Sequence, residues 1–191
     1  MRNNSSIILR NVRFVFVHVF EKDELMQRYS ARILVPKNSP QVQDLIEAFQ
    51  AAVAIGADRL KGYRPNWSET IHDGDAKFDK EGKPVHPGHY YLNAKSNSKP
   101  GIVKVNKSGM GSKTMEITDP DEFYSGCYGC ADIAFFAFNQ GVNRGVSVAL
   151  NNVLKIGGED GEGNGPRIGG GRQNAESVFG AYIEEGEDFP E

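Results

Sequence analysis

The chain has few cysteines and no long apolar run, and both shortages narrow the classes of protein it can belong to. Its 191 residues include two cysteines, yet a chain of this length can bury a core without disulfide staples. No apolar stretch approaches the roughly 20 residues that span a bilayer. The first eleven residues lack the apolar block and cleavage site of a signal peptide. We therefore expect a soluble cytoplasmic protein with no membrane contact.

Motifs for metal binding and catalysis are also missing. Cys127 and Cys130 form one C-x-x-C pair without a second. His86 and His89 could complete a Cys2His2 site, but the spacing from His89 to Cys127 is long for a compact zinc module. We therefore favour the interpretation that both cysteines are small residues packed in a strand, and a zinc-stabilised module is the less favoured alternative. Because no spacing pairs a nucleophile with a base, we expect no metal, no cofactor and no enzymatic activity.

Hydrophobic patterning predicts several strands and one main helix. Residues 38–62 have apolar positions at helical spacing, with Ser39 as a cap and Gly62 as the end. Residues 63–88 have no regular pattern. Segments rich in β-branched and aromatic residues predict strands, and they cover residues 7–21, 28–36, 89–96, 101–106, 123–139 and 145–156. The first two are expected to form a hairpin, as are the last two. In 7–21, alternation places Phe14 and Phe16 on the same face.

These elements favour a mainly β fold, an OB-fold-type barrel with one main α-helix. We assign residues 1–156 to this domain. Residues 157–172 form a Gly-rich linker or loop, which we expect to be flexible because eight of the fifteen residues from 157 to 171 are glycine. Residues 173–191 form a flexible acidic C-terminal tail. Residues 1–172 have 22 basic and 19 acidic side chains, a net charge of +3, and the tail has a charge of −6.

A basic segment without acids is the main candidate for a binding site. Residues 82–115 contain six lysines and no Asp or Glu. Lysines that follow a phosphate backbone, with aromatic rings on which bases stack, are what single-stranded nucleic acid requires. A solvated lysine-rich loop is the alternative for this segment alone. The candidate nucleic-acid-binding residues are Lys95, Lys99, Lys104, Lys107, Lys113, Tyr90 and Tyr91, with Arg28, Tyr29 and Arg32 on the preceding strand.

The acidic tail is a second candidate element. As a tethered polyanion it can compete with nucleic acid for a basic groove at high effective concentration. It can also dock a partner protein through an aromatic anchor, and a solubilising role is the simpler alternative. The candidate partner-binding residues are Glu184, Glu185, Glu187, Asp188 and Phe189.

The order of several motifs resembles the bacteriophage replicative single-stranded DNA-binding protein family. The motifs are RYSARILVPK, HDGD, YYLNAKS, FYSGCYG, FFAFN and RGVSVALNNVLKI, and the resemblance covers roughly residues 7–157. The resemblance implies an OB-fold that binds single-stranded DNA non-specifically and has an acidic C-terminal tail. It also places Cys127 in a barrel strand, as part of the family pattern.

From the residues and the resemblance together we expect a non-catalytic, sequence-nonspecific single-stranded DNA-binding protein of phage replication or recombination. It would act in the bacterial host cytoplasm and recruit replication or recombination proteins through its tail. A homo-oligomer is a further candidate state. The alternative is a β-barrel protein–protein adaptor whose acidic tail is the functional element.

Deleting residues 173–191 should tighten DNA binding, because the deletion removes six negative charges that compete with DNA phosphates for the basic side chains of residues 1–172. The gain should be largest at low salt, where screening is weakest. The gain in affinity is measured by titrating the truncated and full-length proteins with an oligonucleotide at two salt concentrations. Equal affinities at low salt would show that the tail does not compete.

Overall fold

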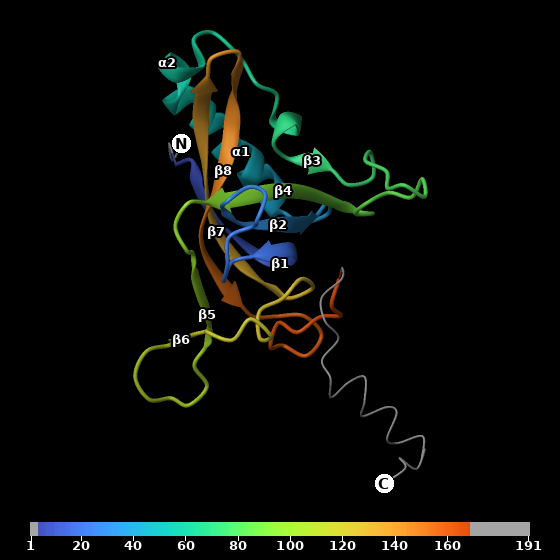
Figure 1. The fold of residues 1–191 in the computed structure, drawn as a ribbon, viewed down its shortest axis with the longest axis vertical. Helices are drawn as coiled ribbons and strands as arrows, with labels where there is room; N and C mark the ends of the chain where they lie inside the picture. The colour runs from blue at the N-terminus through green and yellow to red at the C-terminus, as the bar shows by residue number, and fades with distance from the viewer. Residues whose placement is uncertain (1–3, 169–191) are drawn as a thin grey trace.

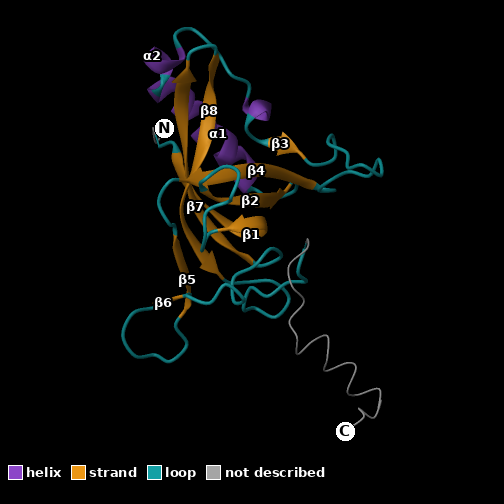
Figure 2. Cartoon of the chain, viewed as in Figure 1, coloured by secondary structure: helices purple, strands orange, loops and turns teal. Residues whose placement is uncertain are grey.

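The computed structural model describes residues 4–168, which form a mainly β structure with one long helix (Figures 1 and 2). This confirms the predicted fold class. The elements in chain order are β1 (Ser6–His18), β2 (Tyr29–Pro36), α1 (Gln41–Ile55), α2 (Ala57–Leu60), η1 (Trp67–Glu69), β3 (His72–Asp73), β4 (His89–Ser96), β5 (Gly101–Val105), β6 (Thr114–Glu116), β7 (Tyr128–Gln140) and β8 (Asn143–Lys155).

The strands form one sheet that closes on itself. The order is β3-β4-β2-β1-β7-β8-β5-β6, with an additional pairing between β4 and β8. That pairing is parallel and sets Ala94 opposite Val148, whereas the four other pairs of the ring are antiparallel. The strands β1, β2, β4, β8 and β7 therefore form a ring of five, which is the arrangement of an OB-fold. The predicted β1–β2 and β7–β8 hairpins are both present.

The core fills the inside of this ring and the space beneath α1. Phe14 and Phe123 pack edge to face with ring centroids 5.2 Å apart. Phe49 of α1 packs in the same manner on Phe135 of β7, at 6.0 Å. Both geometries are the ones that aromatic pairs prefer. The predicted apolar stripe of the helix therefore faces the sheet, with Leu45 and Phe49 fully buried.

The helix ends earlier than the sequence pattern predicts. It is interrupted at Gly56, and the short α2 follows. A Cβ atom on Gly56 would lie 2.1 Å from the Cβ of Ala137, so the glycine allows the helix end to approach β7. The N-cap position is occupied by Pro40 and not by Ser39, although Ser39 Oγ accepts a hydrogen bond from the amide of Gln41 at 3.3 Å. Gly56, and not the predicted Gly62, ends α1.

A β-bulge breaks the alternation of β1. The register of β1 against β2 shifts between Val15 and His18, and Phe16 has a φ of 50°. One extra residue in a strand moves all later side chains to the other face. Phe16 is consequently 56% exposed and Val19 is fully buried. The prediction that Phe14 and Phe16 share a face is wrong for this reason.

The segment around the cysteines is a turn followed by a strand. β7 begins at Tyr128, so the buried Cys127 precedes the strand in which we expected it, whereas Cys130 lies within it. Burial raises the pKa of both thiols. The chain turns at Gly126, whose φ is 120° and where a Cβ would lie 2.2 Å from the carbonyl oxygen of Pro166. Glycine is therefore required at this close approach.

The Gly-rich segment packs against that turn over its described part. The amide of Tyr128 donates to the carbonyl of Gly163 at 2.8 Å, and the amide of Ile168 donates to the carbonyl of Ser125 at 2.8 Å. Residues 157–168 therefore form a hydrogen-bonded loop, and the domain boundaries stay a prediction. The tail, residues 173–191, lies outside the described residues.

Replacing Gly56 by Ala should destabilise the fold by about 1–3 kcal/mol, the usual cost of overpacking, because the added methyl would meet the Cβ of Ala137. Chemical denaturation measures the change. The matched control combines Gly56→Ala with Ala137→Gly, which removes the opposing methyl and should recover part of the loss. A single variant as stable as the wild type would contradict the close packing.

Candidate nucleic-acid interface

The alternation of β2 and β4 separates core residues from outward residues. Ile33 of β2 and Leu92 of β4 are paired and point into the core. Their neighbours therefore point away from this core, in the cross-strand pairs Ser30–Lys95, Arg32–Asn93 and Leu34–Tyr91. Leu34 and Tyr91 are nevertheless buried, because they pack with Val15 in a second, smaller cluster. The bulge of β1 adds the exposed ring of Phe16. We use the term "outer face" for Phe16, Arg32, Tyr91, Asn93 and Lys95.

Arg32 occupies the centre of the outer face. Its guanidinium carbon lies 4.8 Å from the ring centroid of Phe16 and 4.5 Å from that of Tyr91. Its Nε donates to Asn93 Oδ1 at 2.9 Å, and its Nη1 lies 3.2 Å from His86 Nε2. Within residues 4–168, no carboxylate forms an ion pair with this half-buried cation. An arginine held this way has donors and charge available for a phosphate group.

Two histidines pack around the buried ring of Tyr91. The rings of His72 and His86 lie 5.0 and 5.2 Å from the Tyr91 ring. Burial, followed by the positive charge of Arg32, lowers the pKa of His86 to about 4. The pKa of His72 is lowered mainly by burial as well. Both rings are therefore neutral near pH 7, and neutral His86 accepts the hydrogen bond from Arg32.

Among the predicted site residues, Arg32, Tyr91 and Lys95 are brought together on the outer face. Lys95 forms no ion pair within the part of the chain that the structure describes. Arg28 is exposed just before β2. Tyr29 lies on the same side of β2 as the core residue Ile33. The Nζ atom of Lys22 lies 5.8 Å from the centroid of the Tyr29 ring.

Tyr90 lies on the opposite side of β4 from the outer face. Its ring packs edge to face against Trp67, with centroids 5.7 Å apart, so Trp67 has a packing role beside the core. Lys37 Nζ lies 5.2 Å from the Tyr90 centroid and pairs with Asp73 and Asp75. The HDGD motif therefore supplies ion-pair partners to Lys37, and the structure separates Tyr90 from the other candidates.

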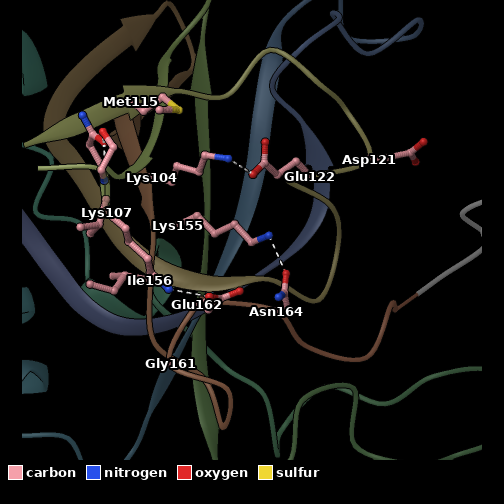
Figure 3. A pocket seen from close by; sticks show the side chains of 13 residues that line it. Lys104, Lys107, Met115, Asp121, Glu122, Lys155, Ile156, Gly161, Glu162 and Asn164 are labelled. Atoms are coloured by element: carbon pink, nitrogen blue, oxygen red, sulfur yellow. Dashed lines mark hydrogen bonds and ion pairs between the residues drawn. The ribbon is translucent and has the colours of Figure 1, made fainter. Parts of the chain in front are cut away.

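Lys104, Lys107 and Lys113 lie on or between β5 and β6, which Figure 1 shows as an arm that extends from the barrel. Figure 3 shows that Lys104 pairs with Glu122 and Lys107 with Glu162, around a pocket of about 590 Å³. Lys99 lies against the ring of Phe20 at 5.5 Å, and Lys113 is exposed. The structure thus divides the predicted lysine groove, and Lys104 and Lys107 are neutralised by acids distant in sequence.

Three residues around Arg32 are not among the predicted site residues. Phe16 was expected on the same face as Phe14, because nothing in the residue pattern marks a bulge. Asn93 lies between Tyr91 and Lys95 at the same period-two spacing, so alternation alone could have found it. His86 was considered as a zinc ligand, whereas its ring contacts Arg32 and Tyr91. Across residues 4–168, no group of three or more His, Cys, Asp and Glu is arranged to hold a metal ion.

Comparison with known families decides the identity of the fold. The model of the family described as "Enterobacter phage Enc34, ssDNA-binding protein" matches residues 5–190, nearly the whole chain. The chain belongs to this family of single-stranded DNA-binding proteins. The resemblance seen in the sequence is therefore confirmed. No curated protein sequence matches the chain.

Solved structures of the Enc34 protein share the fold of this family member. The single-stranded DNA-binding protein from bacteriophage Enc34 matches with a TM-score of 0.66 and 19% identity, covering 92% of this chain and 90% of that chain. The same protein in complex with single-stranded DNA gives a TM-score of 0.62 and 20% identity, with 81% and 88% covered. In the described part of this chain, no helix has the length and apolarity needed to cross a membrane.

The His86 ring should titrate with a pKa of about 4, and Arg32→Gln should move that pKa upward, toward the ordinary value near 6.5, because the neighbouring positive charge is lost. A depressed histidine pKa stabilises the fold above about pH 6.5, and that stabilisation is lost as the pH falls toward 4. NMR titration of the imidazole resonances measures both values. Titration near 6.5 in the wild type would contradict the burial of His86 beside Arg32.

Proposed function

We propose that the outer face binds single-stranded DNA without strict sequence specificity, and that the chain acts by binding rather than by catalysis. The observation that carries the proposal is Arg32, a half-buried cation held between two aromatic rings with no carboxylate partner in residues 4–168. Burying a charge without a counter-charge is costly, and a DNA phosphate would supply the missing negative charge.

The arrangement suits a single strand better than a duplex. Arg32 and Lys95 would contact phosphates, and the exposed ring of Phe16 would stack on a base. Stacking contributes about 1–3 kcal/mol per base and tolerates any sequence, because every base has an aromatic face. Paired bases inside a duplex cannot reach such a ring without unstacking. The solved complex of the Enc34 protein with single-stranded DNA supports the same ligand class.

Family membership does not favour the alternative of a protein–protein adaptor. We place the activity in phage DNA replication or recombination in the cytoplasm of the bacterial host. We also retain the acidic tail as the proposed docking segment for partner proteins, with Phe189 as its anchor. The tail lies outside the described residues, so this role rests on its charge and its position in the sequence.

Replacing Arg32 and Lys95 together by Gln should weaken binding to single strands and reduce the salt dependence. Each phosphate contact contributes about 0.7 to the slope of log K against log salt, so two lost contacts should reduce it by about 1.4. Fluorescence anisotropy with labelled oligonucleotides at several salt concentrations measures both quantities.

The matched control replaces Lys104 and Lys107 by Gln, which removes the same charge from lysines already paired with Glu122 and Glu162. The control should leave the slope nearly unchanged. If the Lys104 and Lys107 variant reduced the affinity and the salt slope more than the Arg32 and Lys95 variant, the interface would have to be assigned to the β5–β6 arm.

A further inference from the structure

A pocket of about 350 Å³ opens at the outer face, beside the loop formed by residues 19–28. Phe16 and Met26 are its large apolar lining residues, and Asn93 and Lys95 contribute polar groups from β4. The rest of the lining is mostly polar and consists of His18, Asp23, Ser30, Ala31 and Arg32. Placed hydrogen-bonding groups beside an aromatic ring can orient a small planar ligand. Its volume is sufficient for a flat nucleobase.

The walls of this pocket are held in place from both sides. Phe16 has a φ of 50°, a conformation that a bulky residue rarely adopts and that occurs mainly at functional sites. Arg32 lies against its ring. The backbone that carries Met26 is held by Asp23, whose Oδ1 accepts from the amide of Met26 at 2.8 Å and from that of Leu25 at 3.0 Å. The ring of Phe16 and the backbone of the Met26 loop therefore have defined positions on the two sides of the pocket.

The hydrogen-bonding groups directed to the pocket are mainly donors. Asn93 Oδ1 already accepts from Arg32 Nε at 2.9 Å, which leaves the Nδ2 group of Asn93 without an acceptor in residues 4–168. The carboxylate of Asp23 is engaged with its own loop, and its other oxygen lies 3.7 Å from His18 Nε2. A base that offers a carbonyl oxygen to Asn93 Nδ2 therefore matches the pocket.

We propose that this pocket receives one unpaired nucleobase of the bound strand, with Phe16 and Met26 beside it and Asn93 Nδ2 donating to a carbonyl oxygen of the base. The inference rests on the proposed function, because it assigns a place within the same interface. Thymine has a carbonyl oxygen on each side of its N3 atom, O2 and O4, whereas cytosine has O2 and, in place of O4, an N4 amino group that is itself a donor. Thymine can therefore present a carbonyl oxygen to Asn93 Nδ2 in either orientation and cytosine in only one, so the pocket prefers thymine to cytosine.

The experiment compares homopolymers of thymidine and deoxycytidine of about 12 nucleotides, within the range of site sizes of one OB-fold. Fluorescence anisotropy measures both affinities. The wild type should bind the thymidine oligonucleotide about fivefold more tightly, which corresponds to one net hydrogen bond. Asn93→Asp keeps the acceptor for Arg32 and replaces the donor by an acceptor. The variant should bind more weakly overall and prefer the deoxycytidine oligonucleotide, whose amino group can donate to it.

Arg28→Gln is the matched control, because it changes the net charge by the same amount from a position that does not line the pocket. This control variant should bind both oligonucleotides more weakly by the same factor and keep the preference for thymidine. Equal, salt-sensitive binding of both oligonucleotides by the wild type would overturn the base pocket and leave the proposed function standing. An Asn93→Asp variant with the wild-type ratio would overturn the role of Asn93. Absence of binding to either oligonucleotide by the wild type would overturn both proposals.

Discussion

The parallel contact between β4 and β8 is the constraint on which the rest of the structure depends. It closes the sheet into a ring, so that each residue of β2 and β4 points either into the core or away from it. Ile33 and Leu92 enter the core, and this forces Arg32 and Asn93 outward between them. The outer face is therefore a direct consequence of filling the inside of the barrel.

Charge pairing separates the binding surface from the rest of the molecule more clearly than the number of basic residues does. Lys37, Lys104 and Lys107 each have a carboxylate partner. Arg32 has aromatic rings, an amide and a neutral imidazole around it instead. A cation in such surroundings retains its attraction for phosphate, whereas a paired lysine must first lose its partner. This difference is why the interface is assigned to β2 and β4 rather than to the β5–β6 arm.

The sequence predicted the longer strands, the helix and the barrel, because hydrophobic periodicity is a local property that each segment carries by itself. The predicted site residues include Arg32, Tyr91 and Lys95, which share the outer face, but also Tyr90, which lies on the other side of β4. The bulge that exposes Phe16 has no local signal. Glu122 and Glu162, which neutralise two predicted lysines, lie 18 and 55 residues away in the sequence. Such long-range pairs become visible when the fold is known.

The most direct test of the central claim is a titration of the isotope-labelled protein with a short single-stranded oligonucleotide, followed by NMR. The Nε–H resonance of Arg32 and the side-chain amide of Asn93 report on the outer face, because these groups are hydrogen-bonded to each other. The account predicts that both shift early in the titration, together with the ring resonances of Phe16. Shifts confined to Lys104, Lys107 and the surrounding pocket, with the resonances of Arg32 and Asn93 unmoved, would contradict it.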